Sequence, residues 1–443
     1  MATQLVASSV EAAVPTINAA DELKLAVART SINQRSRVRR PFEGPAVGTP
    51  SAEYVLKLPV SGDVVDISSA VIRFAGVQPG QAGGGPCRFM DYAAAVMIYS
   101  CEIRLANGSV LTTLTDVGLK ACVSHYLYSN PWAFGDPVRG IGNGPARTAW
   151  ALAARNYELP LSVLLPGVEY WPAFAFGPLE FHIRLAAATQ ALESIAAVVT
   201  PTFTFNATQS FLETDIITLR AGHRANLESQ IKRAFGGTLS IVLESYRTTK
   251  QNIGAAAAAV DIVSPIRTGS LKQILMISQP TATLNNINTL AKFEDYIQNN
   301  VVRYNAELDH VFIPPYEIQI APAVDSYNAY AYSILSARVH DARGGQFGSA
   351  AGDTTRIGYL AFDGTDPSGV AKFILCIDTT RGDGAEPGLL SGTSTLNNAS
   401  DTRLHITYGA AGSTVAATAT VFMVHDIRLS VQLGNANDLL IEA

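Results

Sequence analysis

The chain has 443 residues, more than the roughly 250–300 that one hydrophobic core can serve, so we expect two or three domains. Charged residues make up only 16% of it, hydrophobic residues 48%, and the formal net charge is −5. This negative balance excludes a general field that attracts nucleic acid. A polar surface with few charges is typical of a protein that buries its outside against copies of itself, although drift in an alanine-rich genome explains the composition equally well.

Cysteine spacing and hydropathy exclude further classes. The four cysteines show no CxxC pair and no metal-ligand spacing, so the sequence predicts neither a disulfide framework nor a zinc site and favours a reducing compartment. No apolar run reaches about 18 residues, and no charged segment precedes an apolar block at the start of the chain. We therefore expect neither a membrane-spanning helix nor a secretion signal.

Residues 1–48 are predicted to form an N-terminal arm that is ordered only by what it touches. Within it the segment RSRVRR carries Arg35, Arg37, Arg39 and Arg40, which could bind phosphate, lipid or an acidic neighbour. An arm that packages RNA is usually longer and more basic, because each neutralised phosphate needs its own cation. A solvated arm, or one that contacts another subunit, is the better interpretation.

Strand patterns dominate residues 49–215, the first predicted domain. Alternating apolar residues predict strands in EYVLKLPV (53–60), SAVIRFAG (69–76) and LEFHIRL (179–185). A β-hairpin with a type I′ turn at Asn107-Gly108 is predicted in CEIRLANGSVLTTL, and one helix is predicted directly after it at 115–130. Ahead of the last strand, prolines recur every six residues from Pro160 to Pro178 and exclude a long helix.

A helical connector is predicted at 216–236, where HRANLESQIKRAFGG places apolar residues on one face and ends at a glycine pair. The second predicted domain follows at 237–435, and a C-terminal tail at 436–443. Its strand segments are TLSIVLESY, SLKQILMIS, YEIQIAP, AYAYSIL, GYLAF, KFILCID, RLHITYG and DIRLSVQL, and TLAKFEDYIQNN (289–300) predicts one further helix.

Both halves of the chain follow one plan of many strands, one or two short helices and a closing strand. The sequence Ile-Arg-Leu lies in the middle of each expected closing strand, at 183–185 and at 427–429. The common order of elements, together with this match, predicts an internal duplication. Many strands joined by long connections rich in Gly, Ser and Asp indicate an all-β chain with two β-sandwiches of Greek-key or jelly-roll type.

Two long polar loops are predicted in the second domain, at 340–356 and 379–403, and loops of such length are usually functional or disordered. The second loop contains Arg381, Gly382 and Asp383, which match the integrin-binding tripeptide and make this loop a candidate receptor contact. The chemistry of a flexible loop explains the glycine and the aspartate equally well.

No catalytic, cofactor or metal site is predicted. The seven histidines form no HxH or HExxH motif, GIGNG (140–144) lacks both a preceding strand and a following Lys-Ser/Thr, and no GxSxG occurs. Glu213 and Asp215 are expected on one wet strand face, where nothing requires acid or base catalysis. We therefore expect a protein that is not an enzyme and has no cofactor.

Several passages resemble the double jelly-roll major capsid proteins of icosahedral double-stranded DNA viruses, the lineage of nucleocytoplasmic large DNA viruses, polinton-like viruses and virophages. They are YELPLSVLLPGVEYWPAFAFGPLEFHIRL (157–185), MIYSCEIRLANGSVLTTLTDVGLKACVSHYL (97–127), GSLKQILMI (269–277) and VFMVHDIRLSVQLGNANDLLIEA (421–443). The sequence departs from the family where GNAND replaces the glycine-rich GMGG that ends many nucleocytoplasmic members.

The resemblance implies two consecutive eight-stranded antiparallel jelly-roll barrels with a few short helices. It implies a major capsid protein, assembled in the host cell interior, whose trimeric pseudo-hexameric capsomers tile an icosahedral virion shell. The implied partners are the other chains of a homotrimer, neighbouring capsomers, and minor capsid, penton or membrane proteins that the arginines of the arm would meet inside the shell. Sequence-specific nucleic acid is not among them, and the long loops would form the outer crown.

Two alternatives stay open at this point. One is a capsid protein of another lineage, with a single jelly roll plus a protruding domain. The other is a carbohydrate-binding β-sandwich protein, for which a row of exposed aromatic side chains or paired carboxylates in a groove would be needed. Trp132, Trp150 and Trp171 lie in one region of the first domain and keep the second alternative open.

Overall fold

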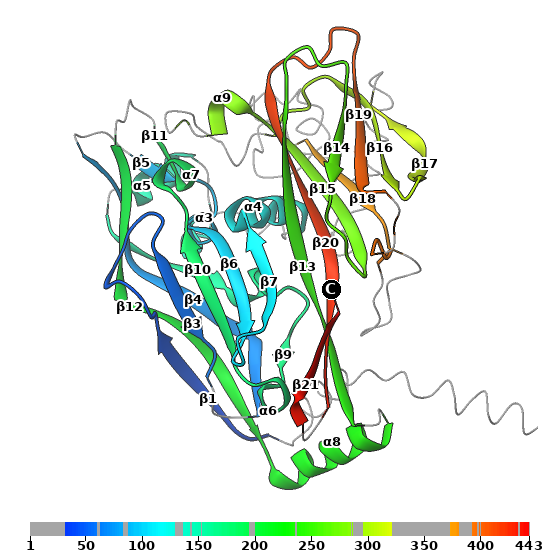
Figure 1. Cartoon of the computed structure of the whole chain (residues 1–443). Coiled ribbons are helices and arrows are strands. Elements are labelled where there is room, and N and C mark those ends of the chain that lie inside the picture. Colours follow the sequence, from blue (N-terminus) through cyan, green and yellow to red (C-terminus); the bar gives the residue numbers. More distant parts are fainter. Residues whose placement is uncertain are drawn as a thin grey trace, which may run out of the picture.

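Two β-barrels lie side by side in the computed structural model of this chain, and helix α8 (Ala221–Ala234), which connects them along the chain, lies at the lower end of the molecule (Figure 1). The structure describes residues 32–442 except for 60–62, 83–86, 129–135, 142–143, 152, 195–199, 235–236, 285, 287–295, 321–372, 381–391, 397, 399 and 433–434. Strands β13 and β20 run next to each other along the first barrel (Figure 1).

The first barrel consists of two antiparallel sheets. In hydrogen-bonded order, one contains β1 (Ile32–Pro41), β12 (Thr200–Leu219), β4 (Val64–Ala82) and β8 (Arg155–Pro160), and the other contains β3 (Glu53–Lys57), β10 (Leu179–Leu185), β6 (Ile98–Leu105) and β7 (Val110–Thr115). Short strands extend these sheets or pair with each other, namely β2 (Val47–Gly48), β9 (Tyr170–Trp171), β5 (Cys87–Phe89) and β11 (Leu192–Ser194).

The second barrel repeats this architecture. One sheet contains β13 (Thr238–Ile253), β20 (Ala417–Gln432), β15 (Leu271–Pro280) and β18 (Ile374–Asp378), with β21 (Asn435–Glu442) paired to β20. The other contains β14 (Ala259–Ser264), β19 (Thr402–Tyr408), β16 (Val301–Leu308) and β17 (Val311–Gln319).

The strand order of the two barrels is identical. When the eight main strands of each barrel are numbered along the chain, both barrels have one sheet in the order 1-8-3-6 and one in the order 2-7-4-5. This order defines a jelly roll built from two Greek keys, so the predicted fold of two consecutive jelly-roll barrels is confirmed.

The residue match that suggested the duplication is wrong in detail. Ile183-Arg184-Leu185 lies on β10, the seventh main strand of the first barrel, whereas Ile427-Arg428-Leu429 lies on β20, the eighth of the second. The two segments are therefore not equivalent, and their likeness reflects only the alternation of apolar and polar residues in both. The duplication is therefore carried by topology and not by this triplet.

In the sheet of β13, β20, β15 and β18, the strands β20, β15 and β18 are buried on both faces, whereas β13 buries one face and leaves the other partly exposed. Along β15, Leu275 and Ile277 belong to the core of the first barrel, whereas Ile274 and Met276 belong to the core of the second. Strand β20 alternates in the same way, and Phe422 is fully buried on the first side. Strands with two dry faces have nearly continuous apolar sequences, which explains why SLKQILMIS and TVFMVHD lack polar alternation.

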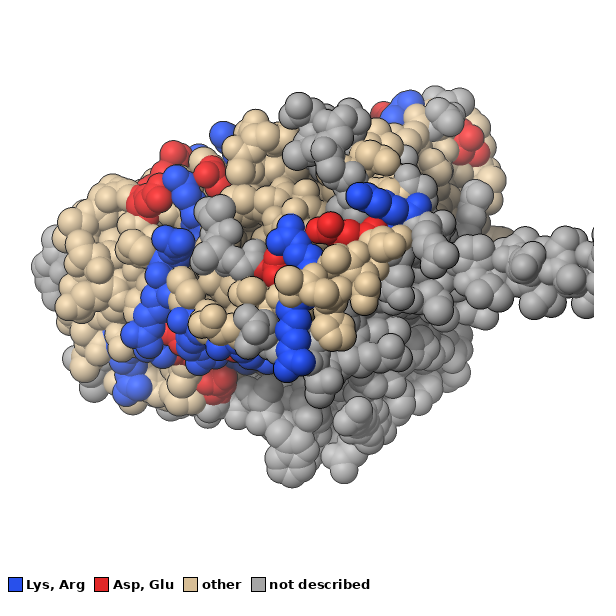
Figure 2. All heavy atoms as spheres, turned by 90° about the horizontal axis from the view of Figure 1, so that it is seen from below, with Lys and Arg blue, Asp and Glu red and all other residues tan. Residues whose placement is uncertain are grey.

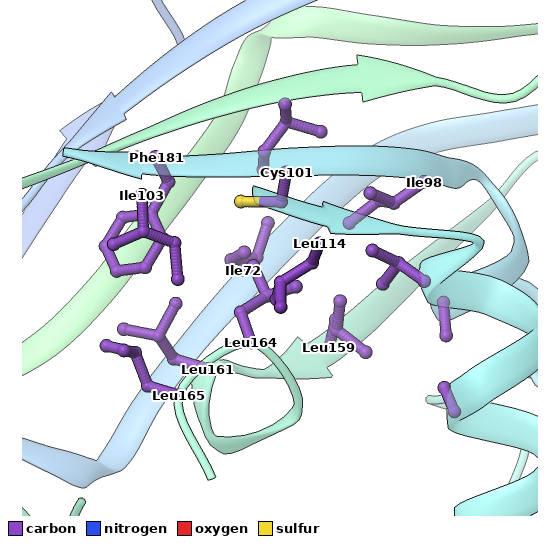
Figure 3. Close-up of a cluster of buried hydrophobic side chains, with 14 of the residues drawn as sticks. Ile72, Ile98, Cys101, Ile103, Leu114, Leu159, Leu161, Leu164, Leu165 and Phe181 are labelled. Carbon is purple, nitrogen blue, oxygen red and sulfur yellow. The ribbon is translucent and has the colours of Figure 1, made fainter. Parts of the chain in front are cut away.

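The proline-punctuated segment closes the core of the first barrel. Leu161, Leu164 and Leu165 from the turn η3 (Leu161–Val163) and its continuation lie against Ile103 and Phe181 (Figure 3). The segment continues into helix α6 (Ala173–Phe176) before β10 begins. Its prolines fix a non-helical path, so that the apolar residues fill the barrel instead of forming a helix.

The predicted helices are confirmed in two of the three described cases. Helix α4 (Val117–Tyr128) follows the hairpin and α8 forms the connector, whereas Tyr296 to Asn300, the described end of the predicted helix 289–300, is not helical. The remaining helices are single turns or short segments: α3 (Ala93–Val96), α5 (Gly144–Trp150), α7 (Ala188–Ala191) and α9 (Thr281–Leu284).

The hairpin of β6 and β7 is confirmed, but its turn differs from the predicted type I′. Only Gly108 has a positive φ, of 86°, and its N–H donates to the Leu105 carbonyl oxygen at 2.8 Å. A longer loop with glycine in the left-handed position therefore replaces the two-residue turn. The Asn107 carboxamide oxygen instead accepts the N–H of Ser109 at 2.9 Å.

The residues at which the barrels begin and end also differ from the predicted boundaries. Residues 32–41, which we assigned to the N-terminal arm, form β1 and pair with β12 along its second half. Strand β12 extends to Leu219, beyond the expected boundary at 215, and β21 occupies the expected C-terminal tail as a strand paired with β20. Long-range pairing decides these boundaries, and local sequence pattern does not record it.

A glycine contact between α3 and α4 gives a test of this packing. A Cβ at Gly118 would lie 2.6 Å from the Val96 Cα, whereas a Cβ at Gly222 on α8 would meet nothing within 4 Å. We expect Gly118→Ala to lower the free energy of unfolding by about 1–3 kcal/mol, because backbone cannot move aside easily. Gly222→Ala should leave it unchanged or raise it by up to about 1 kcal/mol. Urea denaturation measures both, and equal effects would contradict the predicted close approach.

Candidate interaction surfaces

The seam between the two barrels is the first surface that the structure builds. Strand β13 lies against β7 and α4, and this arrangement is visible in Figure 1. The apolar part comes from one face of β13, where Leu239, Ile241 and Leu243 are buried in the core of the first barrel. Because side chains of both barrels share this core, the two barrels form one packed unit.

Polar contacts fix the register of the seam. The hydroxyls of Thr112 and Ser245 lie 2.5 Å apart in a buried hydrogen bond. Further along β13, the Lys250 ammonium lies 2.5 Å from Asp116 Oδ1, at the start of α4. Buried polar groups that find partners across a contact penalise any shifted alignment, because a shift leaves them unpaired.

An arginine ladder covers the outer face of the first sheet. Arg35, Arg37 and Arg39 point to the same side of β1, as strand alternation requires. The Arg37 Nε donates to Asp215 at 2.9 Å and the Arg39 Nε donates to Glu213 at 2.7 Å, both on β12. Seen from below, Lys and Arg side chains gather on one face of the molecule beside Asp and Glu (Figure 2).

The carboxylates of the ladder are largely covered. Side chains of Asp66, Glu213 and Asp215 are 4%, 9% and 13% exposed, so the predicted wet face of Glu213 and Asp215 is wrong although both residues do share one face. Burial alone would raise the pKa of Asp215, but hydrogen bonds from Arg37 and Arg35 hold it below its ordinary value. Arg35 also contacts Asp66 at 2.6 Å.

This ladder changes the interpretation of the basic segment. Three of the four arginines bind carboxylates of their own barrel and attach the edge strand β1 to β12. Arg40 is exposed, and the described part of the chain offers it no ion pair. The predicted contacts of these arginines with partners inside a shell stay a prediction.

The second predicted site lies outside the described residues. Arg381, Gly382 and Asp383 fall in 381–391, and the loop predicted at 340–356 falls in 321–372. Of the loop predicted at 379–403, Thr379 and Thr393 are described, and the Thr393 hydroxyl donates to the Thr379 carbonyl oxygen at 2.5 Å. A receptor contact at Arg381–Asp383 stays a prediction.

Groups for metal or redox chemistry are not brought together within the described residues. No cluster of three or more His, Cys, Asp and Glu side chains is placed to hold a metal ion there. All four cysteines are buried, and burial raises the pKa of the Cys101 and Cys376 thiols far above its ordinary value. Helices in the described ranges are too short or too polar to span a bilayer.

Trp171 cannot belong to the row of exposed aromatic side chains that a carbohydrate site would use. Trp171 is fully buried and its indole N–H donates to the Gly177 carbonyl oxygen at 2.7 Å. It lies 5.4 Å from the ring of Phe176 and serves the core of the first barrel. Trp132 falls outside the described residues.

Sequence reasoning missed the seam and the carboxylates below the arginines. A signal for the seam was present, because an apolar run such as KQILMI cannot belong to a sheet with one wet face. The spacing of Arg35, Arg37 and Arg39 by two residues was a signal for a strand. Their partners lie far away in the sequence, and only the pairing of β1 with β12 reveals them.

Comparison with known proteins agrees with the topology. No protein-family model and no curated protein matches this sequence. A chain of the PBCV-1 virus capsid is similar over 93% of this chain and 97% of its own, with a TM-score of 0.56 and 12% identity. The Faustovirus major capsid protein is similar over 90% and 91%, with a TM-score of 0.53 and 9% identity. The chain has the double jelly-roll fold of these proteins.

At such low identity the likeness is one of fold. It nevertheless removes an alternative, because the double jelly-roll extends over 90% or more of this chain and of both capsid proteins. The expectation of a single jelly roll with a protruding domain is therefore wrong. The second barrel repeats the strand order of the first, which a protruding domain of another fold would not do.

The ladder predicts a pH-dependent stability. Arg37 binds both Asp215 and Glu213, at 2.9 and 3.2 Å, so Arg37→Met leaves two covered carboxylates without this cation. A carboxyl group with a lowered folded-state pKa contributes stability above its unfolded-state pKa and loses it as the pH falls through the folded-state value. We expect Arg37→Met to lower the midpoint of urea denaturation at pH 7 and to lower it much less at pH 3.

The matched control for this prediction is Arg40→Met. It removes the same charge from the same strand, at a position with no ion pair in the described ranges. Its midpoint should follow the unmodified protein at both pH values. A loss of stability for Arg37→Met that is equal at pH 7 and pH 3 would contradict the role of the ladder.

Proposed function

We propose that the chain is a major capsid protein that assembles into trimeric capsomers, which tile an icosahedral virion shell. The observation that carries this proposal is the identical strand order of two barrels packed side by side. Three such chains supply six similar barrels, so a ring with three-fold symmetry has a hexagonal outline. Hexagonal units fill a flat facet without gaps.

The comparisons support the same role. Both similar structures are named as viral capsid components, and the likeness covers nearly the whole length of each chain. The virion is accordingly the proposed location of this chain.

Contacts between neighbouring copies would use walls with few charges. Only 16% of the residues are charged, and interfaces are depleted in charge at their centre. Strand β17 leaves Val311, Phe312 and Tyr316 between 46% and 62% exposed. Pro314 and Pro315 on this edge strand remove backbone donors, which favours contact through side chains over the addition of another strand.

Other partners would meet the N-terminal side of the first barrel. Minor capsid, penton or membrane proteins are proposed to contact the segment before β1 together with Arg40, the arginine outside the ladder. This assignment rests on the exposure of the strand and on its surplus charge. The remaining arginines are already neutralised by the barrel itself.

The direct test is the oligomeric state of the full chain. Light scattering after size-exclusion chromatography should give a particle of three chains of 47.0 kDa. Negative-stain images of the same fraction should show particles with a pseudo-hexagonal outline. A stable monomer or dimer across micromolar concentrations, with no such particles, would contradict the proposal.

A further inference from the structure

A pocket of about 460 Å³ lies at the seam of the two barrels and has no role in the fold described so far. It is lined by helix α4, the proline-punctuated segment and strand β13, and also by residues of β4 and β20, Tyr92 and Arg139. The residues that matter for its chemistry are Lys120, Ser124, His125, Arg139, Glu244 and Tyr246. Any occupant would therefore touch both barrels.

Lys120 brings an ammonium group to this pocket that binds no carboxylate directly. Its ammonium donates to the Ser124 hydroxyl oxygen at 2.7 Å and lies 5.6 Å from the centre of the Tyr246 ring. Among the described residues it forms no ion pair. An ammonium has three donors, so the hydrogen bond to Ser124 leaves donor capacity for a ligand.

The nearest carboxylates bind other cations. Glu244 accepts from Lys272 at 2.9 Å, on β15 of the second barrel. Asp136 lies 3.4 Å from the Arg139 guanidinium and also accepts backbone N–H groups. Lys272 also pairs with Asp426 at 3.4 Å. Burial lowers the pKa of Lys120, and Glu244 opposes that shift from a distance. Lys120 is therefore the cation of this pocket that has no direct ion pair among the described residues.

The other polar groups are donors or can act as donors. The Ser124 hydroxyl accepts from Lys120, which leaves its own proton free to bind a ligand. Arg139 is 43% exposed, so its guanidinium lies toward solvent while its partner Asp136 satisfies part of its charge. Tyr92 lines the same pocket and stays a neutral phenol, because burial raises its pKa to about 12.

We propose that this pocket is a binding site for a small oxyanion of the phosphate class, held by Lys120, Ser124 and Arg139. Charge-assisted hydrogen bonds from an ammonium, a hydroxyl and a guanidinium are the usual means of binding such groups. The volume exceeds that of a bare phosphate, so phosphate monoesters with a small organic group also fit. A bound anion compensates the Lys120 ammonium beside the Tyr246 ring of β13. The proposal does not depend on the capsid function.

The experiment measures thermal unfolding of the full-length protein at increasing concentrations of inorganic phosphate, with ionic strength held constant by sodium chloride. A ligand that binds the folded state raises the midpoint in a saturable manner. Sulfate and glycerol phosphate at the same ionic strength form two further arms, which separate a preference for phosphate from one for any tetrahedral anion. We expect saturation with phosphate and with glycerol phosphate.

Variants assign the effect to the pocket. Lys120→Met should weaken phosphate binding roughly tenfold to hundredfold, as expected for loss of a hydrogen bond to a charged group, and Lys120→Arg should retain it. Lys57→Met is the matched control, because Lys57 is exposed on β3 and pairs with Glu43 outside the pocket. If Lys120→Met does not fold, Ser124→Ala with calorimetric titration of phosphate tests the same site with the charge retained.

Two outcomes overturn the proposal. One is a midpoint that rises no more with phosphate than with sodium chloride, which identifies a general salt effect. The other is a saturable phosphate effect that survives unchanged in Lys120→Met or Ser124→Ala, which places the anion elsewhere on the protein.

Discussion

Burial of one sheet on both of its faces is the constraint on which the rest of this structure depends. The strands β20, β15 and β18 contribute alternate residues to two cores, so that Leu275 lies in one and Met276 in the other. A sheet with two apolar faces exposes a large hydrophobic patch if either side is uncovered. The first barrel therefore shields the outer face of this sheet from solvent. Because both faces are buried, the sequences of β15 and β20 are nearly continuously apolar.

The shared sheet also links the fold to the proposed function. A capsomer made of six similar barrels needs the two barrels of each chain at a fixed angle, and a jointly buried core supplies such rigidity. Thr112 and Ser245 set the register of this contact, and Lys120 faces the same seam from α4.

Local sequence pattern predicted the elements better than their partners. The alternation in LEFHIRL gave β10, the Asn107-Gly108 pair marked the hairpin, and the apolar spacing gave α4 and α8. The same alternation could not reveal that 183–185 and 427–429 lie on non-equivalent strands, because any half-buried strand shows it.

Sites built by distant segments were invisible for the same reason. Arg37 meets its carboxylate partners through the pairing of β1 with β12, and Lys120 faces Tyr246 through the seam of two barrels. A lysine on a predicted helix has no pattern that distinguishes a solvated position from a pocket. Only the tertiary packing supplies the environment that gives either residue its role.

Native-state hydrogen exchange tests the central claim most directly, because it reports the stability of each strand separately. If the doubly buried sheet joins the barrels into one unit, amides of β15 and β20 should exchange only through global unfolding, at the same free energy as those of β4 and β12. Exchange of β15 and β20 at a clearly lower free energy, with the first barrel still protected, would contradict the account.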